Sequence, residues 1–201
     1  TASSRSFASS PSIVTICKSL RSHRFGSSWI TVSIFLLALI TSSGKAKGTK
    51  AYSGCRLEKT SAVRWFIYKK SRPYHYYQWG VKVKHGNFYF HSARYTTTNN
   101  RKLEVGLYND LGTNQTTTSV RLQAVNAKLI YDIATKTNKK KRVWVKVIRK
   151  NKEKGPFGVY TLAGTTGKIK NKKKRIDPTD PSIKGNKKIY SYAMSILNGL
   201  K

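Results

Sequence analysis

The chain has 201 residues, of which 40 are Lys or Arg and only seven are Asp or Glu, so its formal charge is +33. So few carboxylates disfavour carboxylate-rich metal sites and hydrolysis by paired acids. The length suits one domain with appendages, an apolar fraction of 38% allows a modest core, and the charge predicts a polyanionic partner.

The first 46 residues have the composition of a targeting leader. They contain no acidic residue, and basic and serine residues precede an apolar run at residues 29–41, which small residues follow. That order is typical of a secretory signal, with cleavage after Ala46 or after Gly44. The run has 13 residues, and as a helix it spans about 20 Å, short of the roughly 30 Å hydrocarbon core of a bilayer. We therefore predict a cleaved signal segment over residues 1–46 and an N-terminal extension over residues 47–61.

Two other interpretations of this leader stay open. Its serine- and arginine-bearing, acid-free opening is also typical of a transit peptide, which would send the protein to a mitochondrion or plastid. The apolar run is alternatively a buried segment of the folded domain. Export to the exterior or to the cell surface is preferred, because the run is more hydrophobic than transit peptides usually carry.

Residues 62–170 repeatedly alternate apolar and polar side chains, the pattern of strands with one buried face. The tripeptide His85-Gly86-Asn87 lies between two of these runs and indicates a hairpin. We expect a mainly β domain, an antiparallel β-sandwich or small barrel of about seven to eight strands. The alternating runs are residues 63–67, 81–83, 88–90, 103–107, 143–147 and 159–162.

The run at residues 117–133 changes parity midway. Val120 and Leu122 occupy even positions, whereas Val125 and Ala127 occupy odd ones. A β-bulge or a tight connection near Val125 would resolve the conflict, so this stretch is also predicted to be strand.

The C-terminal part of the chain has a different composition. Residues 171–188 are rich in Lys, and Asp177-Pro178 and Asp180-Pro181 both disfavour a helix, so we expect an exposed basic linker. Residues 189–201 space their apolar side chains by three, four and seven positions, which predicts an amphipathic helix. We expect this helix to dock on its own domain, with binding to a membrane surface as the alternative.

No constellation of residues points to catalysis. His75, His85 and His91 would supply the general acid and base that a small cationic ribonuclease needs, but histidines on an aromatic-rich sheet surface are the preferred interpretation. The two cysteines are too far apart for a zinc-binding pattern. We therefore predict no catalytic residue, no metal site and no cofactor, and we infer no small-molecule substrate.

Clustered cations are the strongest functional signal. One cluster surrounds a predicted strand that also presents an indole for stacking on a base or sugar, and a second lies in the basic linker. The aromatic stretch at residues 74–79 is a further candidate stacking surface. The predicted polyanion-binding residues are Lys139, Lys140, Lys141, Arg142, Trp144, Lys146, Arg149, Lys150, Lys172, Lys173, Lys174 and Arg175.

Three functions fit these features. The preferred one is an exported, non-enzymatic protein that binds an anionic polysaccharide, a teichoic acid or an anionic lipid surface of the cell envelope, as antimicrobial proteins do. The second is an RNA-binding component of an organellar ribosome, and the third is a secreted ribonuclease. Charge and stacking serve all of these polyanions, so the sequence does not choose among them.

Overall fold

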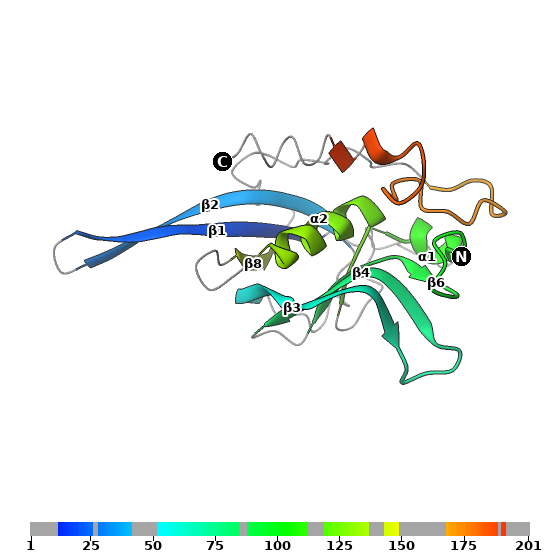
Figure 1. The fold of residues 1–201 in the computed structure, drawn as a ribbon, viewed down its shortest axis with the longest axis horizontal. Helices are drawn as coiled ribbons and strands as arrows, with labels where there is room; N and C mark the ends of the chain where they lie inside the picture. The colour runs from blue at the N-terminus through cyan, green and yellow to red at the C-terminus, as the bar shows by residue number, and fades with distance from the viewer. Residues whose placement is uncertain are drawn as a thin grey trace, which may run out of the picture.

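The computed structural model describes residues 12–25, 28–41, 52–84, 88–111, 119–136, 143–148, 168–188 and 190–191. Its core is a mixed α/β unit in which a five-strand mixed sheet, not closed into a barrel, packs with two helices (Figure 1). Among the described residues, no helix is long and apolar enough to cross a membrane.

The core sheet has the strand order β3-β4-β5-β7, and a short fifth strand, β6, pairs with the start of β4. The neighbouring pairs β3–β4 and β4–β5 are antiparallel, whereas β5 and β7 are parallel. These strands are β3 (Tyr52–Tyr68), β4 (His75–Lys84), β5 (Tyr89–Ser92), β6 (Arg94–Tyr95) and β7 (Ser119–Leu122).

Three further strands extend the sheet beyond β3. β8 (Val143–Ile148) pairs with β3 and with β1 (Ser12–Phe25), which pairs in turn with β2 (Ser28–Thr41). The predicted strand at residues 143–147 is therefore confirmed. The predicted cleavage point after Ala46 lies outside the described residues, so the leader stays a prediction.

The two helices are α1 (Val105–Asn109) and α2 (Ala124–Thr135). α2 lies across one face of the sheet, called here the helix face, and residues 168–188, drawn in orange, lie on the same side (Figure 1). Burying one large aliphatic or aromatic side chain contributes about 1.5–3 kcal/mol, so this interface supplies most of the core energy. The fully enclosed residues of this interface include Val81, Phe90, Leu122, Val125, Leu129 and Ile130.

The opposite face of the sheet, called here the aromatic face, carries Phe66, Tyr77, Tyr89 and His91. Phe66 stacks on Tyr89 with ring centroids 4.5 Å apart, and Tyr77 lies against His91 at 4.1 Å. Phe66 comes from β3 and Tyr89 from β5, so Phe66 must reach across β4. It does so over Gly80, where an added Cβ would lie 2.6 Å from the Cβ of Phe66.

Strand β4 changes the face to which its side chains point. Tyr77 lies on the aromatic face, but Val81, four positions later, is buried in the core on the helix face. Trp79 lies between them with φ at 55°, a left-handed conformation that costs a non-glycine residue about 1–2 kcal/mol. This local conformation explains why a strict alternation does not run through the strand.

The predicted antiparallel sandwich or barrel is wrong, because the sheet is open and contains a parallel pair. The largest local error lies at residues 117–133, where β7 is followed at once by α2. Apolar side chains at the odd positions from 125 to 133 imitate a strand. Ala127, Ile130 and Ala134 are all fully buried, however, and their spacing of three and four places them on one face of a helix.

Other predicted runs have mixed outcomes. Residues 103–107 were expected to form a strand, but only Leu103 makes an isolated bridge, with Tyr95, and α1 follows. The hairpin tripeptide at residues 85–87 and the run at residues 159–162 lie outside the described residues. The strands on either side of residues 85–87 do pair antiparallel, as expected.

The predicted C-terminal helix is described only at its start. Lys187, Lys188, Tyr190 and Ser191 are helical, and Tyr190 packs against the core cluster that includes α2. The apolar stripe predicted for residues 189–201 consists of residue 189 and of residues from 192 onward, which lie outside the described residues, so docking of the stripe stays a prediction.

Candidate polyanion-binding surface

Four acidic side chains among the described residues are either buried or paired. Asp177 and Asp180 are fully buried. Glu104 forms a salt bridge with Arg94, and Asp132 forms one with a lysine one turn away on α2. These carboxylates are therefore not available to neutralise exposed lysines.

Asp177 caps helix α2 from a distant part of the chain. Its Oδ2 accepts a hydrogen bond from the Ala124 backbone N–H at 2.9 Å, and its Oδ1 accepts from the N–H and the hydroxyl of Thr179 at 2.8 and 2.6 Å. The hydroxyl oxygen of Thr179 accepts in turn from the N–H of Val125 at 3.3 Å. The residue before α2, Gln123, makes no side-chain cap. The C-terminal segment thus supplies acceptors that the first turn of the helix requires.

Burial raises the pKa of Asp177 to about 6, although the hydrogen bonds from Thr179 and Ala124 pull the pKa the other way. Desolvation is the larger effect because the side chain has no contact with water. The carboxyl group therefore takes up a proton near pH 6, where an exposed aspartate is still ionised.

Asp180 ties the same segment to the sheet. Its Oδ2 accepts from the Gln78 side-chain amide on β4 at 2.9 Å, and its Oδ1 accepts from the N–H and the hydroxyl of Ser182 at 2.9 and 2.6 Å. We call Asp177, Thr179 and Asp180 the anchor. An exposed linker was predicted over residues 171–188, and that prediction is wrong at the anchor, since all three side chains are fully buried.

The residues before the anchor, 168–175, are called here the basic segment, and their backbone is held at several points. The Asn109 side chain donates to the carbonyl of Ile169 at 3.1 Å and accepts from its N–H at 2.7 Å. At the other end, Leu103 and Arg175 exchange two bonds: the Leu103 N–H donates to the Arg175 carbonyl at 3.0 Å, and the Arg175 Nε donates to the Leu103 carbonyl at 3.1 Å. Between these points, Asn171 closes a turn by accepting from the N–H groups of the two residues that follow Lys172.

The side chains of this fixed backbone point largely into solvent. Arg101 and Lys102, in the turn that bonds to Arg175, are exposed beside them. The exposed lysines of the segment are Lys168, Lys170, Lys172, Lys173 and Lys174, whereas Arg175 is half-buried. The result is a row of cations on a backbone with a defined course.

The predicted binding residues fall into three groups. Lys172, Lys173, Lys174 and Arg175 are brought together in the basic segment. Trp144 and Lys146 lie on β8, where only the backbone is described. Six others lie outside the described residues: Lys139, Lys140, Lys141, Arg142, Arg149 and Lys150. The binding surface predicted around β8 therefore stays a prediction.

The aromatic stretch at residues 74–79 is not one continuous stacking surface. Tyr77 is 9% exposed, Trp79 is 7% exposed, and Gln78 is fully enclosed beneath the anchor. The Trp79 ring instead supports the guanidinium of Arg64, whose carbon lies 3.4 Å from the ring centroid. The sequence signal failed here because the side chains of β4 change faces within the stretch.

Two of the three candidate histidines, His75 and His91, have a ring nitrogen that is hydrogen-bonded to a neighbouring residue. His91 is buried, its Nδ1 donates to the Ser92 carbonyl at 2.7 Å, and burial lowers its pKa to about 3. The Nε2 of His75 accepts from the Arg94 guanidinium at 3.0 Å. The ring nitrogen that a general base would use is therefore enclosed in His91 and occupied in His75. His85 lies outside the described residues.

Among the described residues, no group of three or more His, Cys, Asp or Glu side chains is placed to hold a metal ion. In comparisons with known protein families, curated proteins and solved structures, nothing matches the chain.

Proposed function

We propose that the protein binds RNA through its phosphate backbone and acts as a structural component of a ribonucleoprotein particle. The observation that carries this proposal is the basic segment: exposed lysines on a backbone bonded at both ends, next to carboxylates that are buried or paired. Each phosphate that a lysine neutralises releases a condensed counterion, and this release drives association with nucleic acid.

The fixed course of the basic segment favours RNA over a flexible polymer. Ordering a loop on binding costs conformational entropy, about 1–2 kcal/mol for each backbone residue fixed. The bonds from Asn109, Leu103 and the anchor impose that order before any partner arrives. A preordered row of cations suits a stiff polyanion with regularly spaced phosphates, such as a folded RNA.

Binding to an anionic polymer or lipid of the cell envelope is the second candidate function. The predicted leader favours it, since secretion would bring the protein to such a polymer rather than to RNA. A flexible envelope polymer gains less affinity from lysines held on a fixed backbone. This function therefore requires that affinity depend on the number of charges and not on their arrangement.

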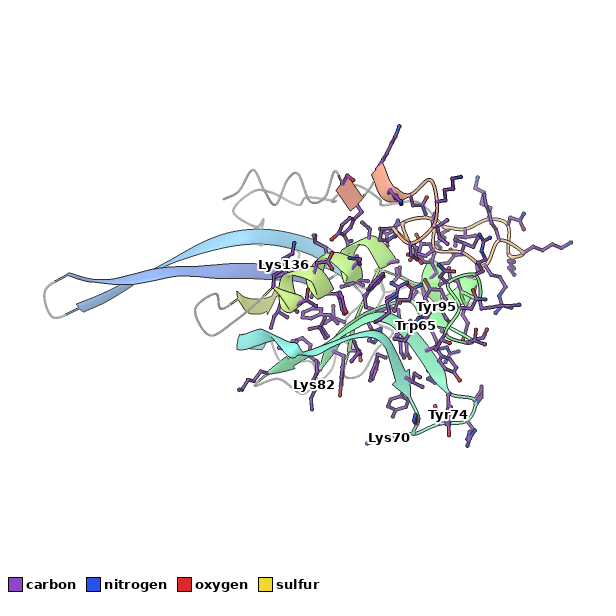
Figure 2. The ribbon with its side chains drawn as sticks, in the orientation of Figure 1. Trp65, Lys70, Tyr74, Lys82, Tyr95 and Lys136 are labelled. Atoms are coloured by element: carbon purple, nitrogen blue, oxygen red, sulfur yellow. The ribbon has the colours of Figure 1, made fainter. Side chains whose placement is uncertain are left out.

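A panel of polyanions separates the two functions. Full-length protein is titrated with a folded RNA, heparin, teichoic acid and anionic vesicles at matched ionic strength. We expect the tightest binding to the RNA, and a loss of about tenfold on that RNA in the variant Lys172→Gln/Lys174→Gln. The matched control is Lys82→Gln/Lys136→Gln, which removes the same charge from exposed positions away from the basic segment (Figure 2). Tightest binding to teichoic acid or vesicles, or equal losses in both variants, would contradict the proposal.

A further inference from the structure

The hairpin between β3 and β4 carries aromatic and basic side chains at its tip. Tyr68 is the last residue of β3 and His75 is the first of β4, and six residues connect them. Lys70 and Tyr74 lie at the tip, which projects away from the rest of the molecule (Figure 2). This surface is separate from the basic segment.

The Tyr68 ring is exposed and rests on a supported partner. Tyr68 is 39% exposed, and its ring is stacked on His75 with centroids 6.0 Å apart and planes 21° apart. Arg94 donates to the Nε2 of His75 at 3.0 Å and is itself held by Glu104 through two bonds of 2.6 and 2.5 Å. The ring pair is therefore ordered before any ligand binds.

The charges on His75 fit this arrangement. A guanidinium has only donors, so the Nε2 of His75 must be unprotonated to accept from Arg94. Desolvation and the charge of Arg94 both lower the pKa of His75, which keeps the ring neutral. A neutral imidazole offers a flat surface to Tyr68 without adding a further cation to the stack.

Three exposed cations follow Tyr68 in the loop of the hairpin, and Glu104, the partner of Arg94, is already paired. Lys69, Lys70 and Arg72 are exposed, and the Arg72 guanidinium lies over the Tyr74 ring at 4.1 Å. Glu104 is the acidic partner of Arg94 and does not face these side chains as a free charge. An exposed π surface beside three cations complements a ligand that has both a flat base and phosphates.

We propose that this hairpin binds an unpaired nucleotide of RNA, with its base stacked on Tyr68 and the adjoining phosphates on Lys69, Lys70 and Arg72. The inference rests on the proposed RNA-binding function and adds a class of substrate to it. A base within a duplex has both faces covered by its neighbours and cannot stack on Tyr68. The hairpin therefore confers a preference for loops, bulges or single strands.

The test compares a single-stranded RNA with a fully paired duplex of the same sequence. Wild-type protein should bind the single strand more tightly. Tyr68→Leu should weaken binding to the single strand by about tenfold and leave the duplex unchanged within about twofold, because one stacking contact is lost. Tyr68→Phe should bind both like the wild type, since it keeps the ring.

The matched control is Val63→Ser, which removes another exposed apolar side chain of β3. It should leave both affinities unchanged, and urea unfolding should show that all variants remain folded. A Tyr68→Leu variant that binds both RNAs like the wild type, or loses equally on both, would overturn the hairpin site and leave the RNA-binding function standing. Wild-type protein that binds neither RNA would instead overturn the function itself.

Anionic vesicles form the third arm of the experiment. If Tyr68→Leu weakened binding to vesicles by about tenfold and left RNA binding unchanged, the hairpin would be a lipid-binding element and the inference would be wrong. We expect no effect of this substitution on vesicles.

Discussion

The two buried carboxylates and the most deeply buried guanidinium lie on opposite faces of the sheet and differ in how many hydrogen-bond partners they have. On the helix face, the anchor carboxylates are fully buried, and each accepts three hydrogen bonds from side chains and backbone. On the aromatic face, Arg121 is 7% exposed, and its Nε and Nη1 have no hydrogen-bond partner. The buried carboxylates therefore have their hydrogen-bond partners, whereas burying the Arg121 guanidinium without partners at two nitrogens lowers the stability of the fold.

This difference shows how a chain with so few acids uses them. The helix face gains a helix cap and a fixed C-terminal segment from the anchor. The aromatic face derives its order from ring packing around Phe66 and leaves cations at its margins, such as Lys82. Substitutions on the two faces should therefore differ in both size and sign.

The largest effect is expected from removing the carboxylate of Asp177. Asp177→Ala leaves buried donors on Ala124 and Thr179 without an acceptor, and each unsatisfied donor costs about 1–3 kcal/mol. We expect the free energy of unfolding to fall by about 4 kcal/mol in urea titrations. Asp177→Asn, which keeps one acceptor oxygen, should lose less than half as much. A loss below about 1 kcal/mol in the alanine variant would show that the anchor does not hold the segment.

The dependence of stability on pH should have opposite signs on the two faces. The pKa of Asp177 in the folded protein is about 6 against an ordinary 3.8, so the folded state binds more protons and stability rises as the pH falls from 6 to 4. The pKa of His91 is about 3 against an ordinary 6.5, so the unfolded state binds more protons and stability falls over the same interval. Each contributes about 1.4 kcal/mol per pH unit, so the two nearly cancel in the wild type.

Single variants should reveal each contribution. Between pH 6 and pH 4, the free energy of unfolding of His91→Asn should rise by about 3 kcal/mol relative to that of the wild type. That of Asp177→Asn should fall by about the same amount relative to the wild type. The measurement is urea unfolding at a series of pH values. Two variants with parallel profiles would contradict the assignment of the two buried groups.

The next effect concerns the passage of Phe66 over β4. Gly80→Ala places a Cβ 2.6 Å from the Phe66 Cβ, and forcing a methyl group into packed space costs about 2 kcal/mol. The matched control is Gly106→Ala in α1, where an added Cβ meets nothing within 4 Å and should leave stability unchanged or slightly raised. Thermal unfolding of both variants gives the answer, and equal melting temperatures would show that Phe66 does not need the glycine.

The smallest effect tests the enclosed base. Arg121→Met replaces a buried guanidinium that lacks partners at two nitrogens with an apolar side chain of similar length. We expect a gain of about 1 kcal/mol in the free energy of unfolding. A loss of stability would mean that Arg121 has a favourable role on the aromatic face.

Local pattern predicted much of the sheet but not its architecture. Alternation at residues 63–67, 81–83 and 143–147 marks true strands, and each of them pairs with a neighbouring strand of the sheet. The same rule failed at α2, where small and large apolar residues satisfy both periods, and the burial of Ile130 decides between them. The parallel pairing of β5 with β7 joins strands that β6 and α1 separate in the chain, and no local pattern specifies such a pairing.

The candidate site was half predicted. Lys172, Lys173 and Lys174 were identified from charge alone, and their exposure follows from it. The anchor was missed because Asp-Pro pairs indicate exposed turns, and its partners, such as Gln78, lie about a hundred positions away in the chain. One signal was present: two of seven acidic residues occur within four positions, beside Thr179 and Ser182, whose hydroxyls commonly bond to aspartate in turns.

The salt dependence of RNA binding tests the central claim most directly. The logarithm of the binding constant is measured against the logarithm of salt concentration for wild type, Lys172→Gln/Lys174→Gln and Lys82→Gln/Lys136→Gln. If the basic segment contacts phosphates, the first variant should lower the magnitude of the slope by about 1.5, because each lost contact removes about 0.7–0.9, and the control should keep the wild-type slope. Equal slopes for all three proteins would contradict the account.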